Sequence, residues 1–386
     1  MRPKTQCVRG DARPDKIGTP IAPVIVPGVT FEFEDHASID RFFEEGSGYL
    51  YSRYDNPTVA QAAREIAALE GAGSAALFAS GMAAMSTAVL TLAAPGKRVV
   101  TQDDVYGGTT ELMARVLPEW GFEVETVRRD ELATLDPARL AGAGVLVLET
   151  PTNPGLRLID LEAVAGVARA AGVVTIVDST FASPLVQRPV ERGIDLAMHS
   201  TTKYLGGHSD LTGGVIAGSA ELVSRIAARR RILGGVMDPF GAFLLMRGLR
   251  TLAVRIEAQQ SSAMAVAEFL AAQPSVESVA YPGLPSHPDH TLAKAQMDGF
   301  GGMVSFCVRG GSTAARAVHD RLRVFHRAGS LGSVESLVSI PALMSHRHVP
   351  REKLDAAGVS EGLLRLSIGL EDAGDLIADL DRALAG

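Results

Sequence analysis

The stretch VVTIVDSTFASPLVQRPVERGIDLAMHSTTKYLGG, residues 173–207, carries the clearest signs of the fold. It opens with a continuous apolar run, VVTIV, that ends in Asp178. A run of strand length without alternation of polar and apolar residues is typical of a parallel strand covered on both faces. Open α/β sheets bind ligands beyond the carboxyl ends of their strands, so we expect the Asp178 carboxylate at a ligand site.

The same pattern of strands and helices continues on both sides of this stretch. Further apolar runs of strand length are AALFA (75–79), RVVTQ (98–102), GVLVLE (144–149) and GGVIAGS (213–219). Segments with helical spacing of apolar residues include TVAQAAREIAALEG (58–71), LEAVAGVARAAG (161–172) and ELVSRIAARRRILG (221–234). This alternation predicts a doubly wound α/β sheet of parallel strands.

The two ends of the chain depart from this central pattern. The first fifty residues are rich in proline and glycine and predict an extended arm, of a kind that often crosses onto a neighbouring subunit. Beyond Leu249, a smaller α+β domain is predicted by a long amphipathic helix (250–273), two strands (303–308 and 363–369) and a final helix (375–386). We therefore expect an arm at 1–55, a ligand-binding domain at 56–245 and a C-terminal domain at 246–386.

Composition and charge narrow the classes of function. The chain has 386 residues, which suits two α/β domains, and a net charge of −7, which provides no basic surface for nucleic acid. Its cysteines, Cys7 and Cys307, are too few for a disulfide framework or a zinc site and favour a reducing compartment, with the cytoplasm as the default. The expected partner is a small molecule.

An uncharged stretch at residues 74–96 meets the length criterion for a membrane span. Its interior contains Ser80, Gly81, Ser86 and Thr87 and is otherwise mostly alanine. A buried strand followed by a buried helix from Gly81 explains this composition better, so we expect no membrane association.

A lysine lies near the end of the opening stretch, in HSTTKY (199–204). A lysine among hydroxyl residues, downstream of an acid at a strand end, is what a pyridoxal cofactor requires. Lys203 would form the imine, the acid would face the pyridine nitrogen, and the hydroxyls would bind the phosphate. Ser80-Gly81-Met82 follows the strand AALFA and opens a helix, so its backbone N–H groups suit the same phosphate. Glu149 is a second carboxylate at a strand end.

Two short motifs resemble those of other protein classes. Residues 200–203 match S-x-x-K, the nucleophile pair of penicillin-binding hydrolases, but the S-D-N and K-T-G tripeptides of that class do not occur in the chain. GAGSAA (71–76) resembles a dinucleotide fingerprint, but it precedes a strand instead of following one. We interpret its glycines as a helix stop and a turn.

Three further segments are candidates for binding. Tyr51-Ser52-Arg53, at the end of the arm, offers a cation and hydroxyls to a phosphate, or is an exposed loop. In LLRLSIG (363–369) the apolar residues share one strand face, so Arg365 on the other face either binds a carboxylate or faces solvent. His346-Arg347-His348 has no acid or cysteine beside it, so we expect a loop there and no metal site.

Taken together, these segments resemble the Cys/Met-metabolism family of pyridoxal 5′-phosphate (PLP) enzymes, which includes cystathionine γ-lyase, cystathionine γ-synthase and methionine γ-lyase. The matching segments are YSRYDNPT (51–58), ASGMAA (79–84), DDVYGGT (103–109), ETPTNP (149–154), VDSTFASP (177–184), HSTTKYLGGHSD (199–210), MRGLRTL (246–252), YPGLPSHP (281–288) and SLGSVESL (330–337). The resemblance implies an aspartate-aminotransferase-type fold. It also implies a homotetramer of dimers that share their active sites.

The resemblance implies roles for individual residues. Lys203 is expected as the Schiff-base lysine, Asp178 as partner of the pyridinium nitrogen, Tyr106 as a ring-stacking residue that assists the chemistry, and Asn153 opposite the phenolic oxygen. The phosphate is expected to bind the backbone of Gly81 and Met82, the hydroxyls of Ser200 and Thr202, and Tyr51 and Arg53 of an adjacent subunit. The substrate α-carboxylate is expected to bind Arg365 with Ser336 nearby, and Glu335 is expected in the substrate site.

The resemblance also favours one reaction within the family. Glu335 in SLGSVESL and Gly108 after Tyr106 resemble the cystathionine enzymes, so we expect a cystathionine γ-lyase-like γ-elimination. The alternative enzymes are cystathionine γ-synthase, methionine γ-lyase and an O-acyl-homoserine sulfhydrylase. The alternative outside enzymes is a protein that binds the cofactor without catalysis. The sequence departs from the usual family residues at Tyr54, Asp55, Glu111, Ser179 and Arg347.

Overall fold

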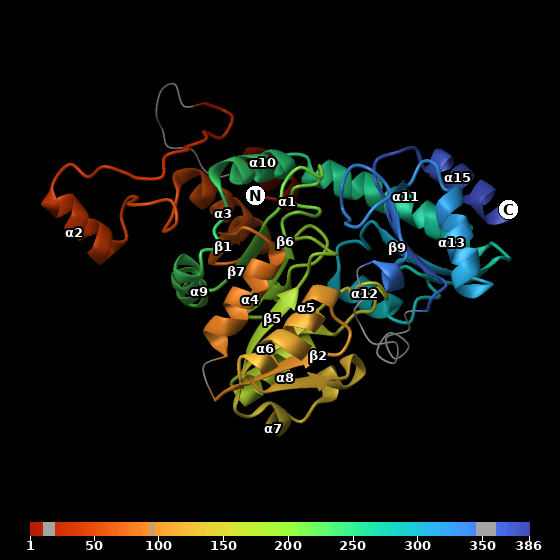
Figure 1. Ribbon diagram of the computed structural model, residues 1–386, viewed down its shortest axis with the longest axis horizontal. Coiled ribbons are helices and arrows are strands. Elements are labelled where there is room, and N and C mark those ends of the chain that lie inside the picture. Colours follow the sequence, from red (N-terminus) through yellow and green to blue (C-terminus); the bar gives the residue numbers. More distant parts are fainter. Residues whose placement is uncertain (11–19, 94–95, 345–359) are drawn as a thin grey trace.

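The computed structural model describes residues 1–10, 20–93, 96–344 and 360–386, and its larger part is built on a seven-stranded sheet (Figure 1). In order across the sheet, the strands are β1 (Ser74–Phe78), β7 (Gly214–Gly218), β6 (Leu196–Ser200), β5 (Val174–Asp178), β4 (Ala143–Glu149), β2 (Arg98–Gln102) and β3 (Val124–Val127). The last five of these strands are parallel to one another. β7 is antiparallel to both of its neighbours, so the prediction of an all-parallel sheet is wrong for this strand.

Helices cover both faces of this sheet, as the prediction of a doubly wound fold requires. One face packs against α4 (Gly81–Leu92) and α9 (Ala220–Leu233), and the other against α3 (Pro57–Glu70), α8 (Leu161–Ala171) and α10 (Pro239–Leu249). Within β4, Val147 belongs to the first core and Leu148 to the second, and every residue of the strand is buried. Burial on both faces explains why these strands appear in the sequence as continuous apolar runs.

Shorter helices and turns lie between the strands of the larger sheet. They are α5 (Gly107–Glu111), a π-helical turn (Leu112–Val116), α6 (Leu117–Glu119), α7 (Pro137–Leu140) and 3₁₀ turns at Arg129–Thr134 and Pro189–Arg192. α5 follows the loop after β2 directly, so its first residues lie at the carboxyl edge of the sheet.

The helix boundaries follow from local capping. Asn56 caps α3 by accepting a hydrogen bond from the Thr58 N–H, and the helix ends at Gly71, whose positive φ of 68° matches the predicted stop. Ser80 caps α4 by accepting from the Ala83 N–H. The uncharged stretch at 74–96 therefore divides into β1 and α4, and in the part of the chain that the structure describes no helix is long and apolar enough to cross a membrane.

A second, five-stranded sheet forms the C-terminal part. Its strands, in order, are β10 (His326–Arg327), β11 (Leu337–Ser339), β12 (Leu363–Ser367), β9 (Met303–Val308) and β8 (Val276–Ala280). Its helices are α11 (Leu252–Ala271), α12 (His290–Gln296), α13 (Gly311–Arg321), a 3₁₀ turn (Pro341–Leu343) and α15 (Ala373–Ala385). α11 runs from the first sheet across to this smaller layer (Figure 1). We propose the domain boundaries stated above, although the one between 245 and 246 falls inside α10.

The N-terminal arm is not wholly extended, which corrects the prediction for the first fifty residues. It contains α1 (Pro3–Arg9), which contacts α3 and α11 and buries Cys7, and α2 (His36–Glu45), which buries no residue. α2 projects away from the body of the molecule (Figure 1). Its N-terminus is closed by a capping box between Asp35 and Ser38, which stabilises the first turn of the helix.

Candidate active site

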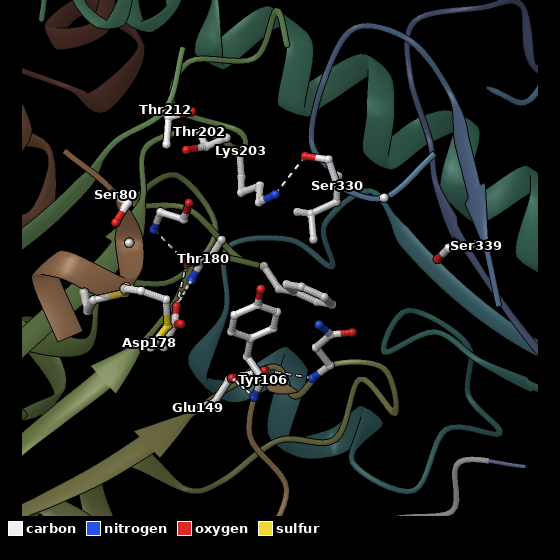
Figure 2. Close-up of a pocket in the computed structure, with 18 of the residues that line it drawn as sticks. Ser80, Tyr106, Glu149, Asp178, Thr180, Thr202, Lys203, Thr212, Ser330 and Ser339 are labelled. Atoms are coloured by element: carbon white, nitrogen blue, oxygen red, sulfur yellow. Dashed lines mark hydrogen bonds between the residues drawn. The ribbon is translucent and has the colours of Figure 1, made fainter. Parts of the chain in front are cut away.

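A cavity of about 690 Å³ lies at the carboxyl ends of β4, β5 and β6 and also borders β11 and β12 of the second sheet (Figure 2). Its position agrees with the expectation that ligands bind beyond the carboxyl ends of the strands. The predicted site residues that line it are Gly81, Met82, Tyr106, Asn153, Asp178, Ser200, Thr202, Lys203 and Arg365. The fold therefore brings together segments that are far apart in the sequence.

The amine of Lys203 lies in this cavity and donates a hydrogen bond to the Ser330 hydroxyl over 2.7 Å (Figure 2). Burial, assisted by the positive charge of Arg365, lowers the pKa of Lys203 from its ordinary value to about 8. Near that pH a large fraction of the amine is neutral and nucleophilic. Ser330 itself has a φ of 119°, a conformation that residues with side chains rarely adopt and that is frequent at functional sites.

Asp178 ends β5 beneath the cavity. Its Oδ1 accepts hydrogen bonds from the backbone N–H of Thr180 (3.0 Å) and from the Thr180 hydroxyl (2.5 Å). Burial raises the pKa of Asp178, and the two Thr180 hydrogen bonds oppose that rise. Among the described residues no cationic side chain donates a hydrogen bond to this carboxylate, so it is suited to a positive charge on a ligand.

Arg365 projects from β12 into the cavity and is only 4% exposed. Its Nη1 donates to Asn153 Oδ1 over 2.8 Å and its Nη2 donates to the Ser330 carbonyl over 3.1 Å. Its Nε is buried and has no hydrogen-bond partner among the described residues. Burial lowers the pKa of this guanidinium to about 10, and a ligand carboxylate would relieve that cost. The reading of Arg365 as a solvent-facing residue is wrong.

The opposite part of the cavity is rich in hydroxyl groups and contains the N-terminus of α4. Ser80, Gly81, Ser200, Thr202 and Thr212 all line it. A Cβ atom at Gly81 would lie 3.1 Å from the Ser200 Cβ, so the helix N-terminus and the end of β6 are in close contact. Free N–H groups at a helix N-terminus, surrounded by hydroxyls, form a site suited to a phosphate.

Comparison with known proteins decides which class of enzyme this geometry serves. The chain matches the family described as "Cys/Met metabolism PLP-dependent enzyme" over residues 4–385. The chain belongs to this family. It is 40% identical to L-methionine gamma-lyase of Pseudomonas putida over 98% of this chain and 96% of that protein. It is 44% identical to cystathionine gamma-lyase of Bacillus subtilis over 88% of this chain and 89% of that protein.

A solved structure of the same family extends this likeness to the fold. Cystathionine gamma synthase from Xanthomonas oryzae pv. oryzae, in complex with cystathionine, has a TM-score of 0.93 and 39% identity over 100% of this chain and 98% of that one. Family membership makes the chain a PLP-dependent enzyme of cysteine and methionine metabolism, which rules out the readings as a serine hydrolase, a dinucleotide-binding protein or a protein without catalysis. The three relatives are named for three different reactions, so the comparisons identify the family and not the reaction.

The cavity fits the PLP of this family. Lys203 offers an amine with a lowered pKa, Asp178 offers a buried carboxylate without a cationic hydrogen-bond donor, and the start of α4 offers N–H groups beside hydroxyls. When bound, PLP supplies an electron sink for a carbanion at the substrate Cα. Lys203 would hold it covalently, Asp178 would face its ring nitrogen, and Gly81, Met82, Ser200 and Thr202 would hold its phosphate.

Tyr51 and Arg53 do not reach this cavity within one chain. The Arg53 Nη1 donates to the carbonyl of Arg231 over 2.9 Å, and its guanidinium lies over the rings of Tyr51 and Tyr54. The cationic side chains among the described lining residues are Lys203 and Arg365 alone. A PLP phosphate would therefore have no cation from the described lining at its own end of the site.

Glu335 and Ser336 are not among the residues that line the cavity, and their expected place beside the substrate stays a prediction. The Ser336 hydroxyl donates to Glu371 over 2.7 Å and accepts from the Gly369 N–H over 2.8 Å, so it is already engaged. The motif SLGSVESL meets the cavity at its first two residues, Ser330 and Leu331. Other lining residues that the sequence did not single out are Thr180, Phe181, Met198, Thr212, Gly329, Leu331, Ser339 and Met344.

The departures from the family pattern that the structure describes, Tyr54, Asp55, Glu111 and Ser179, are not among the residues that line the cavity. Glu111 is exposed and pairs with Arg115 over 2.6 Å. Ser179 is buried and its hydroxyl accepts a hydrogen bond from Gln187 over 3.3 Å. Tyr54 lies under the guanidinium of Arg231 at the end of α9, beside Asp55. Arg347, with the histidines on either side of it, lies outside the described residues, and the described ones contain no cluster of three metal-binding side chains.

Proposed function

We propose that this enzyme catalyses γ-elimination in the manner of a cystathionine γ-lyase, converting L-cystathionine and water to L-cysteine, 2-oxobutanoate and ammonia. The observation that supports it most is the placement of the Lys203 amine and the Arg365 guanidinium on either side of Ser330, in one cavity with Asp178. The Bacillus subtilis relative, 44% identical, bears the name of this activity.

The cavity residues supply each proton and charge that the elimination needs. Arg365 would bind the substrate α-carboxylate through its unpaired Nε and its Nη groups. The Lys203 Nζ, once the substrate amine has displaced it, would move protons at Cα and Cβ. The Tyr106 hydroxyl would give a proton to the sulfur that leaves Cγ, and Asp178 would keep the ring nitrogen protonated.

Gly108 argues against methionine γ-lyase, a family member in which a cysteine is typical at this position. A Cβ atom at Gly108 would lie 2.6 Å from Tyr106 Cε1 and 3.1 Å from the Met82 sulfur. A cysteine there would require the Tyr106 ring to shift from the position it has in this chain. Cystathionine γ-synthase remains the second candidate, because the solved relative with a TM-score of 0.93 bears that name.

Product analysis tests the proposed reaction. The purified enzyme, loaded with PLP, is given L-cystathionine, L-methionine, or O-succinyl-homoserine with L-cysteine, and 2-oxobutanoate and cystathionine are both measured. We expect 2-oxobutanoate from cystathionine at the highest kcat/KM. Formation of cystathionine from the ester as the main reaction would assign the enzyme to γ-replacement, and 2-oxobutanoate from methionine alone would assign it to methionine γ-lyase.

The pKa of Lys203 predicts how the enzyme acquires its cofactor as pH changes. Only the neutral amine attacks the PLP aldehyde, and burial places the pKa of this amine at about 8. The rate of PLP attachment to the cofactor-free protein should rise about tenfold per pH unit below pH 8 and level off above it. Stopped-flow absorbance between pH 6 and 10 measures this rate. A rate that still rises steeply at pH 10 would show an ordinary lysine.

We propose that Tyr51 and Arg53 complete the phosphate site of a neighbouring subunit in a homotetramer, and that the enzyme works in the cytoplasm. The projecting α2 and the uncompensated phosphate end of the cavity support the shared site. The unpaired, buried Cys7 and Cys307 agree with a reducing compartment. Arg53→Ala should weaken PLP binding about 10- to 100-fold, the range for one charge-assisted hydrogen bond.

Subunit complementation tests whether Arg53 acts across subunits. At a PLP concentration too low to saturate Arg53→Ala, the Lys203→Ala and Arg53→Ala chains should each be nearly inactive alone. In a mixed dimer, one site has both residues if they come from different subunits. Co-expression should restore about one quarter of the wild-type sites when the two chains pair at random. No recovery in verified mixed oligomers would show that Arg53 acts within its own chain.

A further inference from the structure

Glu149 is the last residue of β4 and uses both carboxylate oxygens on the backbone of two other site residues. Its Oε2 accepts the N–H of Tyr106 over 2.6 Å, and its Oε1 accepts the N–H of Asn153 over 2.9 Å (Figure 2). The side chain lines the cavity and the residue is only 4% exposed. One carboxylate therefore joins the start of α5 to the loop that follows β4.

The side chains at these two backbone positions both line the cavity. Tyr106 begins α5, and Asn153 accepts the Nη1 hydrogen bond of Arg365 over 2.8 Å. We propose that Glu149 is a positioning residue, which sets the Tyr106 ring and the Asn153–Arg365 pair at a fixed separation. The inference rests on the proposed function in that Tyr106 and Arg365 act on the substrate.

Glu149 is itself held in a rigid place. The Gln102 side chain accepts the Glu149 N–H over 3.0 Å and donates to the Glu149 carbonyl over 3.1 Å. In the sheet Glu149 lies directly opposite Asp178, so two buried carboxylates share one face. Burial and the charge of Asp178 raise the pKa of Glu149. A residue needed only for packing would not require a carboxylate in so unfavourable a place.

The two acceptor bonds make a specific demand on the side chain. Glutamine has the same shape but only one acceptor oxygen. Its NH₂ group, which is a donor, would point at one of the two backbone N–H groups, which is also a donor. One buried N–H group would then lose its partner. Aspartate keeps both oxygens but is one methylene shorter, so it cannot reach both donors.

The test compares PLP-loaded Glu149→Gln with Glu70→Gln as a matched control. Glu70 is a fully buried glutamate on α3 that forms a hydrogen bond with His199 and does not contact Tyr106. We expect Glu149→Gln to retain PLP but to lower kcat about 10- to 100-fold, the range for a misplaced catalytic group. It should also change the circular dichroism of the bound cofactor in the visible range. Glu70→Gln should change thermal stability while leaving kcat within about twofold and that signal unaltered.

A double-mutant cycle shows whether Glu149 acts through Tyr106. Added to Tyr106→Phe, the Glu149→Gln change should reduce kcat by clearly less than it does in the wild-type enzyme, because part of its effect acts through Tyr106. Fully multiplicative losses, or a Glu149→Gln enzyme with wild-type kcat and dichroism, would overturn the proposal. The dichroism needs no substrate, so this test stands even if the substrate proposed above is wrong.

A second variant covers the case that Glu149→Gln does not fold. Gln102→Met removes the amide that holds the Glu149 backbone and keeps a similar volume. It should shift the cofactor dichroism in the same direction and lower kcat by about threefold or more. Wild-type values in this variant would contradict the proposal.

Discussion

Replacement of Lys203 by alanine is expected to lower kcat by at least about a thousandfold, since one change removes both the covalent anchor of PLP and the base at Cα. The structure places this amine inside the cavity, 2.7 Å from the Ser330 hydroxyl, with its pKa lowered to about 8. Steady-state turnover of cystathionine and the visible absorbance of bound PLP should disappear together. The fold should persist, because the lysine forms no part of a hydrophobic core cluster.

Lys294→Ala provides the matched control for this prediction. Lys294 is an exposed lysine on α12 and does not line the cavity. Its removal should leave both turnover and PLP absorbance unchanged. Turnover above one tenth of the wild-type value in Lys203→Ala would contradict the role assigned to this lysine.

Asp178→Asn should lower kcat by about 100- to 1,000-fold, the range measured for loss of one preorganised electrostatic group. Asparagine has the same shape and can still accept the Thr180 hydrogen bonds, so the local structure should survive. It carries no negative charge, so it cannot hold a proton on the ring nitrogen that it faces. The variant should bind PLP yet fail to stabilise negative charge at Cα.

The control for Asp178→Asn is Asp195→Asn, at an exposed carboxylate that accepts hydrogen bonds from the backbone and hydroxyl of Thr175. This control should leave kcat within about twofold. Turnover of Asp178→Asn within threefold of the wild type would show that a neutral partner suffices at the ring nitrogen.

Much of the central fold could be predicted because burial on both faces gives its strands an unmistakable apolar pattern. The direction of β7 could not, since a strand covered on both faces has the same composition whether it runs parallel or antiparallel to its neighbours. The helix α2 was missed although Asp35 and Ser38 are a local capping signal. Proline and glycine nearby had suggested extended structure throughout the arm.

The candidate site likewise contains residues that the sequence could predict and residues that it could not. Asp178 could be predicted because it ends an apolar strand, and Lys203 because it lies in a hydroxyl-rich segment after that strand. Both patterns indicate a ligand site in the sequence. Ser330 could not, because its contact with Lys203 joins residues 127 positions apart and depends on how the second sheet packs. Within its motif, Glu335 and Ser336 were chosen instead, and only the hydrogen bonds of Ser336 to Glu371 show that this serine is engaged elsewhere.

Reductive trapping of the cofactor tests the central claim most directly. Sodium borohydride converts a lysine-linked PLP into a stable amine, which peptide mass spectrometry locates on a single residue. We predict the label on the peptide that contains Lys203, at close to one per chain, and none at this site in Lys203→Ala. A label on another lysine of the wild-type enzyme, or no label in protein saturated with PLP, would contradict the account.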